Sequence, residues 1–177
     1  MSAQPATLAI QTLHRLAWAA GLALAALALL ALTMQPALAQ KKRPLPRFVA
    51  VKTGKVNVRT GPGARYPVQW VLRRRYLPML VIAEFETWRK VRDWEGATGW
   101  VHQATLTGRR TIIVTGRVRA LRRRPDAKAP VVARLQPLVI GRLLACKRRW
   151  CRVQVKSYRG WLPRAAFWGA RKGEVFK

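Results

Sequence analysis

Side chains able to carry out acid–base or nucleophilic chemistry are scarce in this sequence of 177 residues. From residue 40 onward there is one histidine, His102, and one serine, Ser157. The acidic residues are Glu84, Glu86, Asp93, Glu95, Asp126 and Glu174. Catalysis of either kind needs a reactive group beside a second titratable one, and the spacing indicates no such pair. The four acids between residues 84 and 95 alternate, which is typical of the solvated faces of strands.

Metal and cofactor sites are not indicated either. One histidine and two cysteines cannot supply the four ligands of an ordinary zinc site. No phosphate-binding glycine loop and no nucleotide fingerprint occurs in the sequence. We therefore expect a protein that is not an enzyme and that holds no metal and no cofactor.

Cationic side chains are the abundant functional groups. The chain has 35 Lys and Arg residues against six acidic ones, a net charge of +29. Arg15 is the only charged residue among the first 39, so the remainder carries +28. Such a field attracts polyanions without identifying one. Nucleic acid, lipopolysaccharide, anionic lipid and acidic wall polymers all fit, and a basic surface that only maintains solubility is the other interpretation.

The N-terminal segment has the pattern of an export signal. Basic Arg15 precedes an apolar run over residues 16–32, and Ala37-Leu38-Ala39 places small residues where signal peptidase accepts them. We predict a signal peptide at 1–39, cleaved before Gln40, with an uncleaved anchor as the alternative. No second apolar run follows, so no transmembrane segment is expected in the exported part. The basic, proline-containing stretch 40–48 predicts an extended linker.

Export affects how the two cysteines are interpreted. Cys146 and Cys151 are close in sequence, and an oxidising compartment lets a disulfide between them persist. Two reduced, buried thiols are the alternative.

The rest of the chain contains an internal repeat with a spacing of 61 to 63 residues. Val58-Arg59 aligns with Leu121-Arg122, Trp88 with Trp150, and Gly99-Trp100 with Gly160-Trp161. The copies span 49–108 and 109–169, followed by a basic tail at 170–177. Copy one has ten basic and four acidic residues, whereas copy two has 17 and one.

Each copy has the pattern of short strands. β-rich segments such as 49–51, 56–58, 79–82 and 88–94 are separated by Gly and Pro clusters. About five short strands in sixty residues predict a small, closed or nearly closed β-barrel. The expected fold class is therefore all-β, with two tandem barrels after the signal peptide.

The series VNVRTGPG, a following Tyr and Pro, WRKV and GWV resembles the bacterial SH3 family (SH3b), and copy two has the weaker series RALRRRPD, WCRV and GWLP. The resemblance implies tandem SH3-like barrels that bind cell-wall material or protein partners. It also places Cys146 and Cys151 on neighbouring strands of a hairpin, where a disulfide would pin the loop. Copy one has Glu84 and Arg89 at these positions, where an ion pair is possible.

Strand geometry gives the direction of two tryptophans. Trp88 and Val91 are three residues apart, as are Trp150 and Val153, so each pair faces opposite sides of its strand. If the valines form the core, the tryptophans face outward, at the ligand-platform position of SH3 domains. The alternative is that each tryptophan covers a gap between the two barrels.

The segment GWLPRAAF in copy two resembles the closing segment of eukaryotic SH3 domains, with Pro163 in the ligand-contacting position. The later ligand tyrosine is replaced by Ala166, and by Thr105 in copy one. Those domains need acidic loop residues for a basic, proline-rich ligand, whereas these loops are basic, which disfavours such a ligand. The candidate ligand-binding residues are Arg59, Tyr66, Trp88, Trp94, Trp100, Arg122, Trp150, Tyr158, Trp161 and Pro163.

Three classes of partner follow from these observations. The first is peptidoglycan or another anionic polymer of the periplasm or cell envelope, bound by exposed rings and by arginines that pair with carboxylates and phosphates. The second is an envelope protein that offers an acidic peptide to a barrel edge or groove. The third is nucleic acid, because arginines among aromatics also describe single-strand binders, although export disfavours it.

Overall fold

The computed structural model describes residues 43–175, which contain strands and two short 3₁₀ turns. The predicted signal peptide at 1–39 lies outside the described residues, as does the start of the predicted linker. Between residues 43 and 175, no helix has the length and apolar character needed to cross a membrane.

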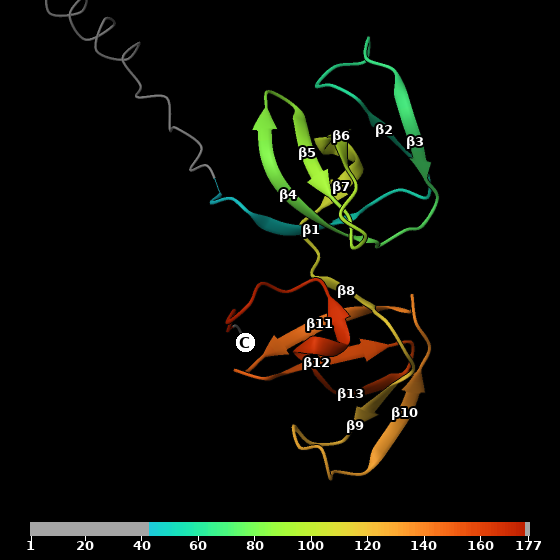
Figure 1. Cartoon of the computed structure of the whole chain (residues 1–177), viewed down its shortest axis with the longest axis vertical. Coiled ribbons are helices and arrows are strands. Elements are labelled where there is room, and N and C mark those ends of the chain that lie inside the picture. The colour runs from blue at the N-terminus through green and yellow to red at the C-terminus, as the bar shows by residue number, and fades with distance from the viewer. Residues whose placement is uncertain (1–42, 176–177) are drawn as a thin grey trace, which may run out of the picture. The chain divides into compact units, whose positions relative to one another are not determined.

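Each copy of the repeat forms one antiparallel sheet of seven strands (Figure 1). Copy one contains β1 (Arg47–Val51), β2 (Val56–Arg59), β3 (Val68–Leu72), β4 (Pro78–Phe85), β5 (Trp88–Arg92), β6 (Thr98–His102), the 3₁₀ turn η1 (Gln103–Thr105) and β7 (Leu106–Thr107). Copy two contains β8 (Thr111–Val114), β9 (Arg119–Arg122), β10 (Val131–Leu135), β11 (Ile140–Cys146), β12 (Trp150–Val155), β13 (Tyr158–Pro163), η2 (Arg164–Ala166) and β14 (Phe167–Trp168).

The two sheets have the same topology. Their strand orders are β3-β2-β6-β5-β4-β1-β7 and β10-β9-β13-β12-β11-β8-β14, which correspond strand by strand. The predicted fold class is confirmed, with seven strands in each copy rather than about five. Two of the additional strands, β7 and β14, are two residues long and pair with β1 and β8.

The loop between the second and third strand has the same conformation in both barrels despite different sequences. The Thr60 N–H donates to the Pro67 carbonyl at 3.1 Å, and the equivalent Arg123 N–H donates to Pro130 at 3.0 Å. Proline fixes its own backbone angle and suits such turns. The repeated prolines therefore preserve the loop where its other residues differ.

Alternating apolar residues fill the two cores. Equivalent residues occupy the same core positions: Val58 and Leu121, Val81 and Leu143, Val91 and Val153, and Val101 and Leu162. Because successive side chains on a strand face opposite sides, burial of Val91 and Val153 leaves Trp88 and Trp150 on the outer face, where both are half-buried. The predicted direction of these tryptophans is confirmed.

Glycines allow the second strand to cross closely over the sixth. A Cβ at Gly99 would lie 2.3 Å from a methyl carbon of Val58, and one at Gly160 would lie 2.7 Å from the Arg122 carbonyl oxygen. Contacts under 3.0 Å are essentially never made by real Cβ atoms. The Gly-Trp pairs in the sequence thus mark the points where β2 approaches β6 and β9 approaches β13.

Strand β8 is buried on both faces. Ile112 packs in the core of barrel two, whereas Ile113 belongs to the core cluster of barrel one. Phe48 of β1 also meets Trp168 of β14 edge to face, with ring centroids 4.7 Å apart. β1 begins at Arg47, which is opposite Val81 of β4, within the stretch predicted to be a linker up to residue 48.

Asp93 departs from the expected solvated face. It is buried, and its Oδ1 accepts hydrogen bonds from the backbone N–H groups of Glu95 at 3.0 Å and Ala97 at 2.8 Å. A buried carboxylate is tolerated where backbone donors satisfy it. Asp93 therefore shapes the loop between β5 and β6.

The two barrels use different bonds at one equivalent hairpin position. Cys146 and Cys151 are directly opposite in the β11–β12 register and form a disulfide. In the β4–β5 register Glu84 is directly opposite Arg89, whose Nε lies 2.8 Å from the carboxylate, and Arg47 contacts the same carboxylate. Both predicted contacts, the disulfide and the ion pair, are present.

This equivalence predicts that barrel one accepts an engineered disulfide. The double variant Glu84→Cys/Arg89→Cys should form it on air oxidation, because the two positions are opposed in the same register as the natural pair. Mass spectrometry with thiol alkylation before and after reduction measures the outcome. Glu84→Cys/Lys90→Cys, whose second residue is one step out of register, should keep two free thiols; equal oxidation of both variants would contradict the equivalence.

The close crossing at Gly160 predicts a large loss of stability on a small substitution. Gly160→Ala should lower the free energy of unfolding by about 1–3 kcal/mol, because the new methyl group meets a backbone oxygen that cannot rotate away. Urea denaturation followed by tryptophan fluorescence measures the loss. Gly54→Ala is the matched control, since a Cβ there meets nothing within 4 Å; equal stability of the two variants would refute the explanation.

Candidate functional site

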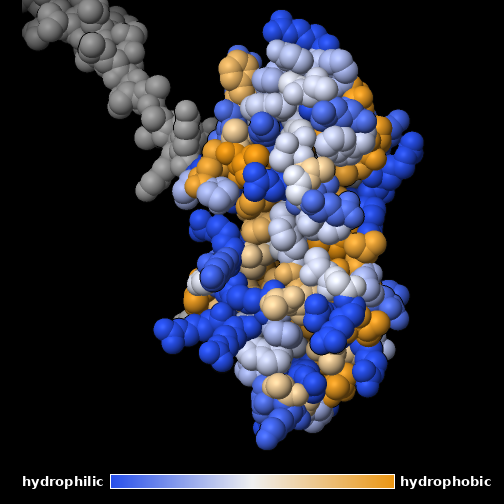
Figure 2. Space-filling view, viewed as in Figure 1, coloured by the Kyte–Doolittle hydropathy of each residue, from blue (hydrophilic) through white to orange (hydrophobic). Residues whose placement is uncertain are grey.

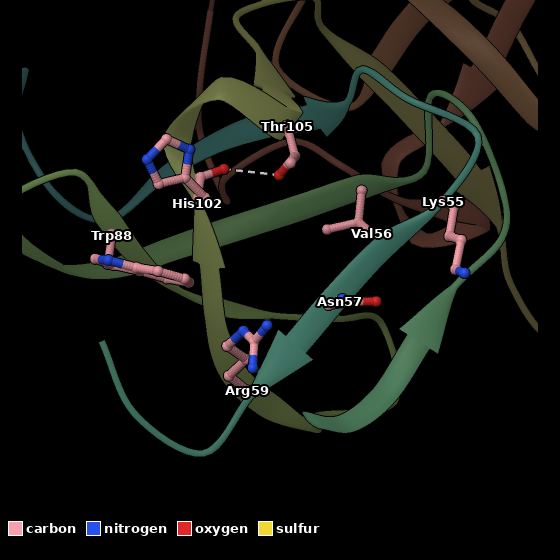
Figure 3. Close-up of a pocket in the computed structure, with 7 residues that line it drawn as sticks. All are labelled: Lys55, Val56, Asn57, Arg59, Trp88, His102 and Thr105. Atoms are coloured by element: carbon pink, nitrogen blue, oxygen red, sulfur yellow. Dashed lines mark hydrogen bonds between the residues drawn. The ribbon is translucent and has the colours of Figure 1, made fainter. Parts of the chain in front are cut away.

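A groove opens on the outer face of barrel one beside Trp88. It has a volume of about 420 Å³ and is lined by Lys55, Val56, Asn57, Arg59, Trp88, His102 and Thr105. Figure 3 shows Trp88 and His102 facing the side chains of β2 across this groove, which we call groove one. The close approach of β2 to β6 brings the two walls together.

The ring of Trp88 is held against His102. The two residues are opposite in the β5–β6 register, and their rings meet edge to face with centroids 5.4 Å apart. His102 Nδ1 accepts a hydrogen bond from the Ala104 N–H at 3.4 Å, so in the neutral ring Nε2 carries the proton. The hydroxyl of Thr105 donates to the His102 carbonyl at 2.7 Å. Groove one thus offers a flat ring and several polar donors.

Barrel two has a groove at the equivalent place, which we call groove two. It has a volume of about 520 Å³, and Trp150, Pro163 and Arg122 occupy the positions of Trp88, His102 and Arg59. Trp150 and Pro163 are opposite in the β12–β13 register, as Trp88 and His102 are in barrel one. Every residue lining either groove belongs to one barrel, so the tryptophans do not cover a gap between the barrels.

One arginine in each groove supports the neighbouring loop. Arg59 Nη1 donates to the Tyr66 carbonyl at 2.6 Å, and Arg122 Nη1 donates to the equivalent Ala129 carbonyl at 2.6 Å. Hydrogen bonds from a charged donor are stronger than neutral ones. Arg59 and Arg122 therefore fix the loop beside the groove while their remaining N–H groups stay available as donors.

The structure brings together five of the ten predicted ligand-binding residues. Arg59 and Trp88 line groove one, and Arg122, Trp150 and Pro163 line groove two. The other five line neither groove. In barrel one, Tyr66 lies against Gly61 and Gly63 in the loop after β2, Trp94 packs on the core, and Trp100 is on β6 opposite Lys90. In barrel two, Tyr158 is at the start of β13, and Trp161, also on β13, has the Lys147 ammonium group over its ring. Binding by any of the ten remains a prediction.

Sequence reasoning missed several groove residues. Lys55, Asn57 and His102 were not among the binding candidates, nor were Arg119 and Arg134 in groove two. Alternation along β2 was the available signal for Lys55 and Asn57, since they share one face of their strand with Arg59. The strand that would lie opposite them could not be identified from that pattern. Alternation does not predict Arg119, which shares its face of β9 with the core residue Leu121.

The molecular surface mixes hydrophilic and hydrophobic side chains. On the face in Figure 2, hydrophobic side chains form small patches separated by hydrophilic ones. Within residues 43–175 no group of three or more His, Cys, Asp or Glu side chains could hold a metal ion.

Comparisons with known proteins agree with the repeat. The sequence model described as "Bacterial SH3 domain" matches residues 52–108 and again 117–169. No curated protein sequence matches the chain.

Solved structures with similar folds include NlpC2 from Trichomonas vaginalis, at 11% identity, over 72% of this chain and 49% of that one, with a TM-score of 0.33. NlpC1 from the same organism matches at 13%, over 76% and 50%, with a TM-score of 0.33. An NlpC/P60 family protein from Bacillus cereus matches at 14%, over 71% and 57%, with a TM-score of 0.31. The chain thus spans about half the length of these proteins.

The C-terminal tail is anchored by an ion pair. Arg110 donates to both oxygens of Glu174, at 2.6 and 2.9 Å, and the Arg171 N–H donates to Oε2 at 2.9 Å. The hydrogen bonds from Arg110 hold the pKa of Glu174 below its ordinary value, although burial acts in the opposite direction. The described part of the predicted basic tail therefore packs on barrel two.

This lowered pKa predicts a pH-dependent anchor. A carboxylate with a lowered pKa stabilises the folded state fully above its ordinary pKa, and the contribution disappears as the pH falls through the lowered value. Carbon-detected NMR should show Glu174 titrating below the ordinary value of about 4.3. Glu174→Gln should expose the tail to protease at neutral pH but make little difference in strong acid; equal protection of both proteins at neutral pH would contradict the anchor.

Proposed function

Because the chain belongs to the bacterial SH3 domain family, with one domain at residues 52–108 and another at 117–169, we propose that it is a non-catalytic binding protein of the cell envelope. Tandem domains of this family are typical cell-wall-binding modules. In this proposal grooves one and two are the binding sites, and the ligand is peptidoglycan or another anionic polymer of the envelope. The export pattern at 1–39 and the Cys146–Cys151 disulfide support a periplasmic or envelope location.

Recurrence of the same groove in both barrels is the observation that carries this proposal. A half-buried tryptophan stands at the equivalent position in each groove, beside arginine and without any acidic lining residue. Flat rings fit the faces of sugars and peptides, and arginine forks pair with their acidic groups. Two equivalent grooves on one chain would also raise avidity for a polymer with repeated units.

A second candidate is capture of a partner peptide at a sheet edge. Strands β3 and β10 stand at the end of their sheet orders, and each exposes a valine, Val68 and Val131. An unpaired edge is a template for an added strand. The positive charge around β10 favours an acidic peptide.

Cosedimentation of the purified protein with purified sacculi tests the envelope proposal. Near physiological salt, about 0.15 M, screening leaves mainly short-range contacts. We expect the wild-type protein to be retained, and Trp88→Ala/Trp150→Ala to bind about tenfold more weakly, or about 1.4 kcal/mol.

Tyr158→Ala is the matched control: Tyr158 is a candidate from the sequence, but its ring is exposed, 51% accessible, and lines neither groove, so with the grooves as the binding sites its loss should leave binding unchanged. Failure of the wild-type protein to bind sacculi would overturn peptidoglycan as the ligand, and equal binding by the double variant would overturn the assignment of the grooves as the binding sites. Recovery of an acidic protein by crosslinking in intact cells, without wall fragments, would favour the adaptor instead.

A further inference from the structure

Grooves one and two differ in charge although their frames are the same. Among the lining residues, groove one contains the cations Lys55 and Arg59, whereas groove two contains Arg117, Arg119, Arg122 and Arg134. Neither lining includes an acidic residue. Because the two barrels have the same strand order, a difference between the two grooves can be separated from what the fold itself requires.

Strand register identifies the three added arginines. The β2–β3 and β9–β10 pairings correspond residue by residue, so Arg119 stands where barrel one has Val56, and Arg134 where it has Val71. Arg117 stands at the position of Gly54. Val56 is a core residue, only 2% exposed, so the fold of barrel one does without a charge there. Arg117, Arg119 and Arg134 are therefore not requirements that the two barrels share.

Two of the four guanidinium groups are fixed in place by backbone oxygens. Arg119 Nε donates to the Thr115 carbonyl at 3.3 Å, and Arg122 Nη1 donates to Ala129 at 2.6 Å. Within residues 43–175, the side chains of Arg117 and Arg134 have no hydrogen bond or ion pair with the protein. Four like charges around one groove repel one another, and a multiply charged anion would relieve that repulsion.

The floor of groove two suits a sugar ring. Trp150 faces Pro163 across the β12–β13 register, where barrel one has the pair Trp88 and His102. Pro163 thus stands where barrel one has the imidazole ring of His102, and it offers an apolar surface without a hydrogen-bond donor. Groove two therefore combines an apolar platform with four lining arginines.

We propose that groove two binds a phosphorylated glycan, with a sugar face on Trp150 and Pro163 and its phosphate held by Arg119, Arg134 and Arg117. A phosphate monoester carries a charge of about −1.5 to −2 near neutral pH and has three acceptor oxygens, which matches several guanidinium groups better than a single carboxylate does. Groove one, with Asn57, His102 and Thr105 at its walls, binds the uncharged part of the polymer. This assignment rests on the proposed use of the grooves and names the ligand class of the second.

Calorimetric titration with defined saccharides tests the assignment. The probe is a β-1,6-linked glucosamine disaccharide bearing two phosphates and no acyl chains, compared with its dephosphorylated form and with inorganic phosphate. We expect the bisphosphorylated disaccharide to bind most tightly. Arg134→Val, which restores the equivalent of Val71, should weaken that binding about 10- to 100-fold, as expected for charged hydrogen bonds, without affecting the dephosphorylated form.

Arg119→Val is the second variant, and it should preserve folding because valine is the core residue of barrel one at this position. Arg152→Val is the control, since Arg152 is an exposed arginine of the same barrel that does not line the groove. An equal loss with Arg152→Val would overturn the proposal in favour of general charge attraction. Equally tight binding of inorganic phosphate, or of single-stranded DNA of the same charge, would overturn it too.

The two proposals fail in different ways. Loss of sacculus binding with retained, Arg134-dependent binding of the phosphorylated disaccharide would refute peptidoglycan as the ligand and support the assignment of groove two. Binding of sacculi that depends on Trp88 and Trp150, with no preference for the phosphorylated disaccharide, would support the first and refute the second.

Discussion

The close crossing of the second strand over the sixth is the constraint on which both grooves depend. At Gly99 and Gly160 the absent side chains let β2 and β9 approach the hairpins that carry Trp88 and Trp150. A larger residue would separate the two walls of each groove. Core formation and groove formation are thus parts of one packing arrangement, because the face of β2 that buries Val58 leaves Asn57 and Arg59 on the other side.

Sequence patterns predicted the fold class and the two tandem barrels because the repeat kept its structural residues. Alternation placed the valines inside and the tryptophans outside. The repeat aligned the Gly-Trp pairs, but that they lie at the strand crossings became evident only from the structure. The opposing groove walls could not be predicted, because they depend on which strands become neighbours across the barrel. His102 faces Trp88 only through the β5–β6 register. Asp93 was misjudged because its backbone partners are defined by a loop conformation rather than by spacing.

Comparison of the two copies separates residues that the fold requires from positions at which different residues are tolerated. The loop after the second strand keeps its backbone hydrogen bonds and its arginine anchor, through Arg59 in one copy and Arg122 in the other. Positions that differ, such as Val56 and Arg119, can change without altering strand order. Divergence at groove walls on a preserved frame is expected when one scaffold serves two related contacts.

Charge also explains how each barrel is held together. Barrel one contains four acidic residues, and one of them, Glu84, forms ion pairs with Arg47 and Arg89 at the β4–β5 hairpin. The equivalent hairpin of barrel two uses the Cys146–Cys151 disulfide instead, in a copy with 17 basic residues and one acidic residue. A covalent bond is insensitive to the repulsion that such a charge produces. The carboxylate that pairs with Arg110 belongs to Glu174 in the C-terminal tail. Barrel two is therefore stabilised by a disulfide within the repeat and by an ion pair with a residue outside it.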